Sequence, residues 1–204
     1  MGRGPLFGRV YAAAVILPNN SDSNLDFDYS KMKDSKKFHS SKKINEVSDY
    51  IKSKAVRYAI AYEEHSVIDA INIRCATHRA MHSAIRKIIN QKENNIVLID
   101  GNDTQLLTYF DNDSEILREI PQICIKGGDN KYCCIAAASI LAKVARDTYI
   151  SDLCAQYPDL NEKYDLLNNK GYGSSKHLAG IKQYGCSKWH RLTFGTCKNY
   201  APSV

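Results

Sequence analysis

The amino-acid sequence predicts a layered α/β or mixed α+β domain, and three observations lead to this fold class. A continuous apolar run from Val10 to Leu17, closed by Pro18, is typical of a strand buried on both faces. Further along, segments with helical spacing alternate with short apolar strands, as they do in layered α/β folds. The 204 residues, 44% hydrophobic and 25% charged, suit one domain with a full core and exclude a disordered chain.

The first half of the chain is predicted to contain a loop and then two helix and strand pairs. Polar residues dominate Asn19 to Ser30, which indicates the loop. A helix is predicted from Ser41, and residues 56–62 then alternate with the period of two typical of a strand. A second helical stripe precedes the apolar block 96–99, which predicts the next strand. The helical positions are Ile44, Val47 and Ile51 in the first helix and Ile73, Ala76, Ala80, Ala84 and Ile88 in the second.

The second half is predicted to contain one short strand and two helices. The strand candidate is Ile123 to Ile125. A long helical pattern from Ile135 to Leu153 ends before Pro158. Ser174 or Ser175 suits the N-cap of a last helix, which we expect to stop at Gly185.

Composition permits nucleic-acid binding and argues against a membrane protein. The 28 basic and 22 acidic residues give a net charge of +6, which suits a partner that carries phosphates. No apolar stretch approaches the roughly 20 residues of a transmembrane helix, so we expect a cytoplasmic protein. The seven cysteines form no Cys-x-x-Cys pair, and the spacing of His177, Cys186, His190 and Cys197 matches no familiar zinc site.

Two acidic residues stand where predicted strands end. Asp100 follows the block 96–99, and Asp129 follows Ile123 to Ile125 after a short glycine turn. Because α/β sheets place their sites at the carboxyl ends of strands, these carboxylates are candidate ligands for one divalent cation. Hard oxygen ligands indicate Mg²⁺ or Mn²⁺. Asp-Gly and Gly-Gly-Asp are also ordinary turn sequences, and that structural interpretation stays open here.

Two segments rich in glycine are candidates for recognition of a ligand. In Gly2-Arg3-Gly4, the glycines allow backbone N–H groups to approach a ligand, and the guanidinium suits a phosphate. Tyr172 stands between Gly171 and Gly173, where its ring can stack on a sugar or base. A flexible N-terminus and an ordinary exposed tyrosine are the competing interpretations.

Basic residues in two places are candidates for phosphate contacts. Lys36 belongs to a basic turn from Lys33 to Lys37. Ser139, Lys143 and Arg146 are four and three residues apart, so they share one face of the long helix. Solvated surface lysines and an ordinary amphipathic helix are the alternatives.

Taken together and in order, these segments resemble the ribonuclease HII (type 2 ribonuclease H) family, most closely its bacterial branch. The resemblance implies a ribonuclease H-like fold with a mixed central sheet flanked by helices. It also implies a single domain over 1–204, with a catalytic core over about 1–155 and a small C-terminal helical portion over about 156–204. The matching stretches cover essentially the whole chain: Gly2 to Leu6, Ala12 to Leu17, Asp34 to Lys37, Ile99 to Gly101, Lys126 and Gly127 with Asp129, Ala136 to Asp147, Gly171 to Gly173 with Lys176 and His177, and His190, Arg191, Thr193 and Phe194.

The resemblance implies an endonuclease that hydrolyses the RNA strand of RNA–DNA hybrids and cuts 5′ of ribonucleotides embedded in duplex DNA. The products would carry 3′-hydroxyl and 5′-phosphate ends. In that family four carboxylates hold two divalent ions, Mg²⁺ or Mn²⁺, and Asp100 and Asp129 match the third and fourth. The resemblance assigns the ribose 2′-hydroxyl to the Gly2-Arg3-Gly4 backbone and the neighbouring deoxyribose to Tyr172. It assigns phosphates to Lys36, Ser139, Lys143 and Arg146, and it implies a monomer.

Departures from the family pattern qualify these expectations. The pattern has Asp-Glu-Ala directly before Gly-Arg-Gly, and Met1 stands at the alanine position, so the first two carboxylates are absent from the sequence as given. We therefore expect a truncated chain of very low activity, with a catalytically inactive hybrid-binding protein as the alternative. Arg9 stands where a proline is usual, and an extra glycine precedes Asp129. The long stretch between the two acids predicts a surface insertion around residues 103–114.

Overall fold

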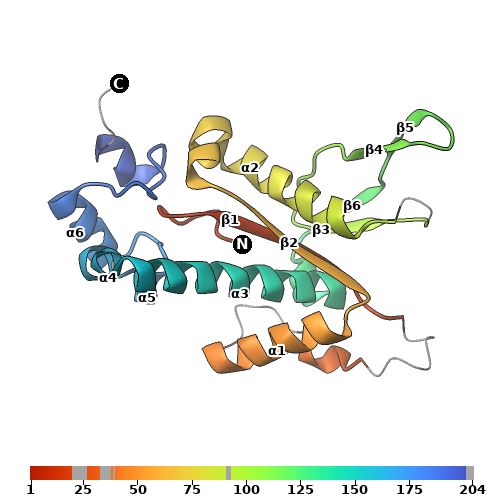
Figure 1. Cartoon of the computed structure of the whole chain (residues 1–204), viewed down its shortest axis with the longest axis horizontal. Helices are drawn as coiled ribbons and strands as arrows, with labels where there is room; N and C mark the ends of the chain where they lie inside the picture. The colour runs from red at the N-terminus through yellow and green to blue at the C-terminus, as the bar shows by residue number, and fades with distance from the viewer. Residues whose placement is uncertain (20–26, 33–37, 39, 91–92, 201–204) are drawn as a thin grey trace. The chain divides into compact units, whose positions relative to one another are not determined.

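The computed structural model describes residues 1–19, 27–32, 38, 40–90 and 93–200, and Figure 1 shows its elements. The chain divides into two compact units. Unit 1 consists of Met1–Tyr11, Tyr62–Ala80 and Lys143–Val204, and unit 2 consists of Ala12–Ala61 and Met81–Ala142. Lys36 lies outside the described residues, as does most of the loop predicted from Asn19 to Ser30.

The predicted first strand, helix and second strand are confirmed as β1 (Val10–Ile16), α1 (Ser41–Lys54) and β2 (Arg57–Glu63). β1 pairs with β2, and only its first three residues are fully buried, so the expected burial of the whole strand on both faces is wrong. In α1, the Ser40 hydroxyl caps the helix by accepting from the N–H of Lys43. A 3₁₀ turn, η1 (Tyr29–Lys31), precedes it.

Helix α2 (His65–Ile88) contains the predicted alanine stripe but begins earlier than the stripe does. Its first part ends at Asn72, whose φ of 64° is not helical. The Asn72 side chain then accepts from the N–H of Cys75 at 3.1 Å, which is the contact of an N-cap. The stripe from Ile73 to Ile88 therefore corresponds to the second part of α2, which has its own cap.

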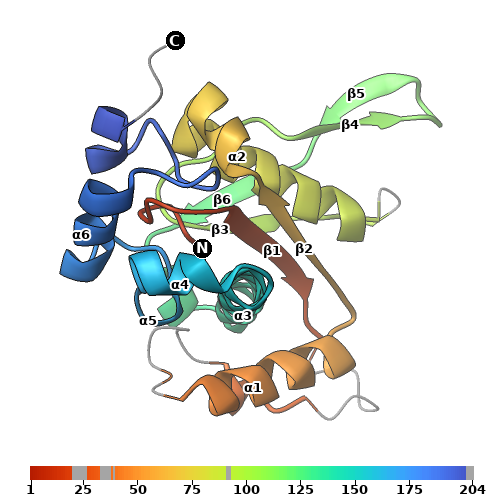
Figure 2. The ribbon, with the colours of Figure 1, turned by 60° about the vertical axis from the view of Figure 1, so that its left-hand side comes forward.

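The strand that ends in Asp100 and the strand that precedes Asp129 lie side by side in unit 2. β3 (Val97–Asp100) and β6 (Gln122–Ile125) are parallel neighbours, and Asp100 is in register with Ile125 (Figures 1 and 2). Parallel pairing brings the carboxyl ends of both strands to the same edge. Ile99 anchors β3 in the core of unit 2, together with Ile85, Leu107 and Ile120.

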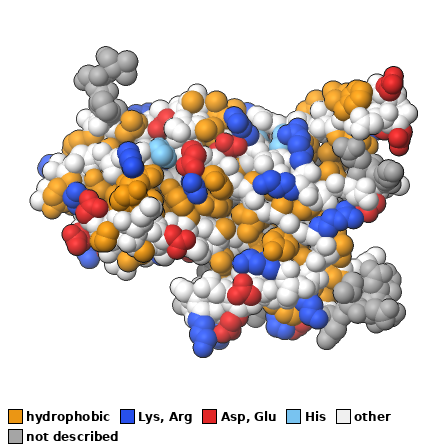
Figure 3. Space-filling model, viewed as in Figure 1, with side chains coloured by type: hydrophobic (Ala, Val, Ile, Leu, Met, Phe, Trp, Pro, Cys, Tyr) orange, Lys and Arg blue, Asp and Glu red, His pale blue; other side chains and the backbone are white. Residues whose placement is uncertain are grey.

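The insertion predicted around residues 103–114 overlaps the first strand of a hairpin that the sequence patterns do not predict, and the second strand lies beyond it. β4 (Thr108–Asp111) and β5 (Ile116–Glu119) pair antiparallel, with Phe110 opposite Leu117. Both of these side chains are more than half exposed. Figure 3 shows hydrophobic side chains over this hairpin and acidic side chains at its end. Among the described residues, the strands form three separate two-stranded sheets.

The C-terminal part of the chain is helical. The predicted long and last helices are confirmed as α3 (Cys133–Gln156) and α6 (Ser175–Tyr184), the latter capped by the Ser174 hydroxyl. Two short helices, α4 (Pro158–Tyr164) and α5 (Leu166–Asn169), and a 3₁₀ segment, η4 (Gly195–Tyr200), complete it. In unit 1, α4, α5 and α6 gather around the C-terminal end of α3, and their core includes Ile150, Leu166 and Ile181 (Figure 2).

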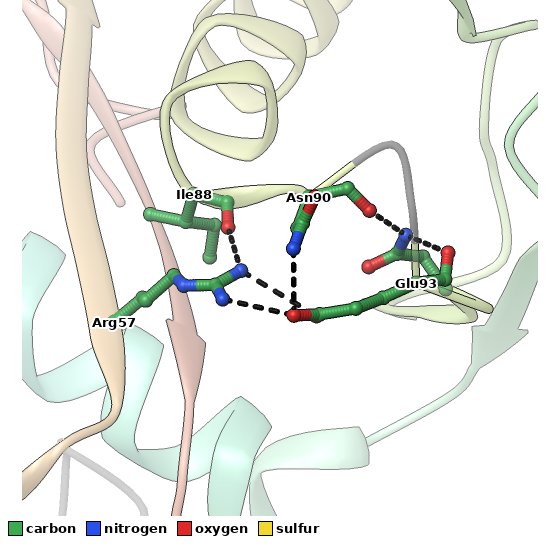
Figure 4. A network of polar contacts seen from close by, with 5 residues as sticks. Arg57, Ile88, Asn90 and Glu93 are labelled. Carbon is green, nitrogen blue, oxygen red and sulfur yellow. Dashed lines mark hydrogen bonds and ion pairs between the residues drawn. The ribbon is translucent and has the colours of Figure 1, made fainter.

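A polar network ties β2 to the end of α2 within unit 2 (Figure 4). The Arg57 guanidinium donates to the carbonyl oxygen of Ile88, the last residue of the helix, at 3.1 Å, and to Glu93 Oε1 at 3.0 Å. Asn90 donates to the same carboxylate oxygen at 2.8 Å. The hydrogen bond from Arg57 lowers the pKa of the Glu93 carboxyl. Arg57 thus satisfies a helix-terminal carbonyl that has no partner within the helix.

The structure also bears on the expectations for cysteines and membranes. All seven cysteines are free thiols, of which Cys154 and Cys197 are buried. Among the described helices, none is long and apolar enough to cross a bilayer. The cytoplasmic location inferred from the sequence stays a prediction.

Candidate functional site

The structure places Asp100 against the turn that contains Asp129, at one edge of the β3–β6 pair. Asp100 ends β3, and its Oδ1 accepts from the N–H of Gly128 at 2.9 Å. Gly127 has a φ of 64°, which turns the chain after β6 and leads it into the 3₁₀ turn η3 (Gly128–Asn130). Asp129 directly follows Gly128, so this hydrogen bond joins Asp100 to the residue just before Asp129.

The two carboxylates differ in their surroundings. Asp100 is exposed, whereas Asp129 is 6% exposed and accepts from the side-chain amide of Asn130 at 3.2 Å. Within the described part of the chain, no group of three or more His, Cys, Asp or Glu side chains is arranged to hold a metal ion. Mg²⁺ is commonly held by one or two carboxylates, with waters and substrate phosphates as its other ligands. Asp100 and Asp129 are thus carboxylates of the type that such an ion takes from a protein.

The predicted glycine segment and Tyr172 also lie together, in unit 1. Gly2 has a φ of 83°, and a Cβ atom placed on it would lie 2.4 Å from Nε of Arg146. The same atom placed on Gly4 would lie 3.6 Å from the ring of Tyr172, which is 48% exposed. The glycines thus allow the backbone to lie against a buried guanidinium on one side and an exposed aromatic ring on the other.

Arg146 lies beneath this segment rather than on the surface. The side chain is 2% exposed, and Nη2 donates to the carbonyl oxygen of Phe7 at 3.4 Å. Its guanidinium carbon lies 5.9 Å from the centre of the Tyr172 ring. Burial lowers the pKa of this arginine, and its Nε atom is buried without a hydrogen-bond partner among the described residues.

A buried histidine pair, His177 and His190, holds the backbone of Tyr172. The N–H of Ser187 donates to His190 Nδ1 at 2.9 Å, so the neutral ring carries its proton on Nε2. That Nε2–H donates to His177 Nε2 at 3.0 Å, and His177 Nδ1–H donates to the carbonyl oxygen of Tyr172 at 2.9 Å. Burial lowers the pKa of both histidines, to about 3 for His190.

A second feature that the sequence patterns do not reveal is Arg191, whose side chain is fully buried. It is surrounded by the backbone of residues 2–9, here called the N-terminal loop. Its guanidinium donates to five main-chain carbonyl oxygens of this loop. The acceptors are Gly8 (2.8 Å), Arg3 (3.2 Å), Pro5 (2.8 Å), Gly2 (2.8 Å) and Arg9 (3.0 Å). Burial lowers the pKa of Arg191 to about 9, so the group stays protonated at neutral pH.

The remaining predicted residues lie along α3. Ser139, Lys143 and Arg146 share a face of this helix by their spacing. Lys143 pairs with the Asp147 carboxylate one turn on, and both side chains are partly exposed. Lys36 lies outside the described residues.

Solved structures with the same arrangement of elements identify the fold. The ribonuclease H2 of Pyrococcus horikoshii OT3 superposes with a TM-score of 0.73 at 21% identity, over 98% of this chain and 93% of that one. The ribonuclease HII in the PCNA:RNase HII complex from Archaeoglobus fulgidus gives a TM-score of 0.65 at 20% identity, over 96% and 92% of the two chains. The chain therefore has the fold of the type 2 ribonucleases H, and the predicted fold class is confirmed.

Sequence comparison adds the family. The family model for ribonuclease HII matches residues 1–197. The protein named Ribonuclease HII of Endomicrobium trichonymphae is 41% identical over 193 residues, which is 95% of this chain and 81% of that protein. Its namesake in Synechocystis sp. is 39% identical over 197 residues, covering 95% and 92%. This chain belongs to the ribonuclease HII family.

Proposed function

We propose that this chain is an endonuclease that hydrolyses the RNA strand of RNA–DNA hybrids and cuts 5′ of ribonucleotides embedded in duplex DNA. The products carry 3′-hydroxyl and 5′-phosphate ends. Family membership at about 40% identity over nearly the whole chain supports the reaction class. The observation that carries the proposal is the pairing of Asp100 with the turn that holds Asp129, at the carboxyl edge of β3 and β6.

Asp100 and Asp129 are the residues proposed to hold a divalent cation, Mg²⁺ or Mn²⁺. Both offer the hard oxygen ligands that these ions prefer. When bound, such an ion supplies Lewis-acid stabilisation of charge on the attacked phosphodiester and on the oxygens that attack and leave. The Gly128 N–H holds Asp100 Oδ1 in place, which leaves the other carboxylate oxygen for a ligand.

Recognition of the ribonucleotide is assigned to the N-terminal loop and Tyr172. Arg3 and Gly4 are exposed, and their backbone N–H groups can donate to a 2′-hydroxyl oxygen, the group that distinguishes RNA from DNA. The half-exposed ring of Tyr172 offers a flat apolar face to the adjoining sugar. Arg146 supports both from beneath through its buried guanidinium.

Contacts with phosphates are assigned to Ser139, Lys143 and Lys36. The phosphate contact expected of Arg146 is not retained, because its side chain is only 2% exposed and lies against Gly2. Lys143 exchanges its ion pair with Asp147 for a phosphate at little cost, because both side chains are partly exposed. The net charge of +6 favours the polyanion in general. Binding is therefore expected to weaken steeply as salt rises. We also propose that the chain acts as a monomer, which sedimentation at several protein concentrations tests.

The decisive experiment combines cutting and binding on one pair of substrates. A DNA duplex with a single ribonucleotide and the same duplex without it are incubated with the protein and Mg²⁺ or Mn²⁺. We expect cleavage only 5′ of the ribonucleotide, and a loss of about a hundredfold or more in Asp100→Asn and Asp129→Asn. Salt-sensitive binding should be nearly unchanged in both variants. Asp113→Asn, in the turn between β4 and β5, is the matched control.

Each outcome of this experiment has a definite reading. Undiminished cleavage by Asp100→Asn would remove that residue from the site. Preferential binding of the ribonucleotide duplex without any cutting would establish the hybrid-binding alternative. Equal binding of both duplexes without cutting would refute both functions.

A further inference from the structure

We infer that Arg191 is a specificity-determining positioning residue, which sets the orientation of the backbone N–H groups that meet the ribose. This inference rests on the proposed function, since it concerns how the N-terminal loop reads its substrate. The guanidinium has five N–H donors in a rigid plane, and all five bonds end on carbonyl oxygens of residues 2–9. Its own backbone N–H donates to the carbonyl oxygen of Leu6 at 2.8 Å.

The geometry of the peptide bond links these carbonyls to the other side of the loop. In a trans peptide, the C=O of one residue and the N–H of the next point in opposite directions. The carbonyls of Gly2 and Arg3 point at Arg191, so the N–H groups of Arg3 and Gly4 point away from it. Among the described residues, these two N–H groups donate to no protein acceptor, and both residues are exposed. Such outward N–H groups are donors for an oxygen ligand.

The chain directly after Arg191 is held by a carboxylate on α2. Asp69 Oδ2 accepts from the N–H of Leu192 at 2.8 Å, and Oδ1 accepts from the N–H and hydroxyl of Thr193 at 2.9 and 2.5 Å. These are the two residues that directly follow Arg191. Asp69 thus fixes the chain that carries the guanidinium, and the guanidinium fixes the loop.

A lysine at position 191 keeps the charge but not the geometry. Its ammonium has three donors at a single nitrogen, whereas the arginine reaches five acceptors from three nitrogens. At least two carbonyls would lose their bonds and be free to turn, and the N–H groups opposite them would turn as well. A purely structural role for Arg191 predicts a smaller folded fraction and equal losses on every substrate. A positioning role predicts a selective loss.

The test measures equilibrium binding of the two duplexes, with and without the single ribonucleotide, without divalent cations. We expect Arg191→Lys to reduce the preference for the ribonucleotide duplex by about tenfold, the effect of misplacing one hydrogen bond. Binding of the all-DNA duplex should stay close to wild type, because phosphate contacts dominate it. Arg57→Lys, which alters a multiply bonded arginine of unit 2, should keep the full preference. Thermal melting verifies that each variant is folded.

A folded Arg191→Lys variant whose preference is within about twofold of wild type would overturn the inference, as would an equal loss in Arg57→Lys. If Arg191→Lys does not fold, Asp69→Asn decides, because an amide cannot accept from Leu192 while it keeps both bonds to Thr193. A smaller loss of preference in that variant supports the inference, and an unchanged preference overturns it. Lack of preference in the wild type would instead refute the assignment of the loop, and the inference would fail with the proposed function.

Discussion

Lowering the pH from about 7 to about 5 is expected to destabilise the protein by about 2 kcal/mol through His190 alone. The side chain is 1% exposed, and burial, followed by repulsion from His177, lowers its pKa from 6.5 to about 3. The unfolded chain takes up a proton near pH 6.5, whereas the folded chain takes it up only near pH 3. Stability is therefore complete above the higher value and is lost as the pH falls through this window. At about pH 5 the pH lies about 1.5 units below the pKa of the unfolded histidine, and each unit corresponds to about 1.4 kcal/mol of lost stability.

Other titrating groups act in the same direction or outside the window. Burial also lowers the pKa of His177 and His65, so the total loss should exceed the contribution of His190. The carboxyls with a lowered pKa, such as Asp111 at about 2, stay ionised down to lower pH. Protonation of His190 would place a hydrogen on Nδ1, which now accepts from the N–H of Ser187. The series of hydrogen bonds from Ser187 through His190 and His177 to the carbonyl oxygen of Tyr172 would then be broken at its first bond.

Urea unfolding at a series of pH values measures this effect, with the fluorescence of Trp189 as the signal. Trp189 is the single tryptophan of the chain and directly precedes His190. In His190→Gln, the loss between about pH 7 and 5 should be smaller than in wild type by about 2 kcal/mol. Parallel pH profiles for wild type and His190→Gln would refute the reasoning.

Four substitutions probe packing within unit 1. Gly2→Ala should abolish most of the preference for a ribonucleotide duplex, because its Cβ would lie 2.4 Å from Arg146 Nε at a φ of 83°; an unchanged preference in the binding assay would contradict this. Gly180→Ala should lower the free energy of unfolding by about 1–3 kcal/mol or more, since its Cβ would lie 2.0 Å from the carbonyl oxygen of Lys163. Gly185→Ala, which meets no atom within 4 Å, should cost only the strain of a backbone at φ 76° and ψ −169°, a region that is almost exclusive to glycine, about 1–3 kcal/mol; urea unfolding measures both variants. Arg9→Ala should lower the free energy of unfolding by about 1–2 kcal/mol in the same assay. Arg9 pairs with Glu64 at 2.7 Å, and its guanidinium carbon lies 4.1 and 4.5 Å from the ring centres of Tyr62 and Tyr149. Unchanged stability would show that these contacts contribute nothing.

Elements with a strong local pattern are predictable from this sequence. Helices α1, α3 and α6 have apolar stripes or capping serines, and their predicted and observed bounds agree within a few residues. The β4–β5 hairpin is not predicted, because its strands have four residues and expose Phe110 and Leu117 instead of alternating between core and solvent. Helices α4 and α5 are too short for a periodic pattern to emerge.

The residues of the candidate site also differ in whether the sequence predicts them. Asp100, Asp129 and Tyr172 are predictable because strand ends and glycine turns mark them locally. Arg191 and Asp69 are not, since they act on backbone atoms, and a carbonyl acceptor leaves no trace in the residue types. Gly2 and Arg191 are 189 positions apart, so no spacing rule joins them. In the sequence, Arg191 appeared only as part of a family match.

The central claim is that Asp100 and Asp129 share one divalent cation. Titration with Mn²⁺, followed by the electron paramagnetic resonance of the free ion, tests it without any substrate or cleavage step. Wild type, Asp100→Asn, Asp129→Asn and the double variant are compared. If the cation is shared, each single variant should lose about as much affinity as the double variant, because either change dismantles the same site. Losses that simply add, or Mn²⁺ binding that survives in the double variant, would contradict the claim.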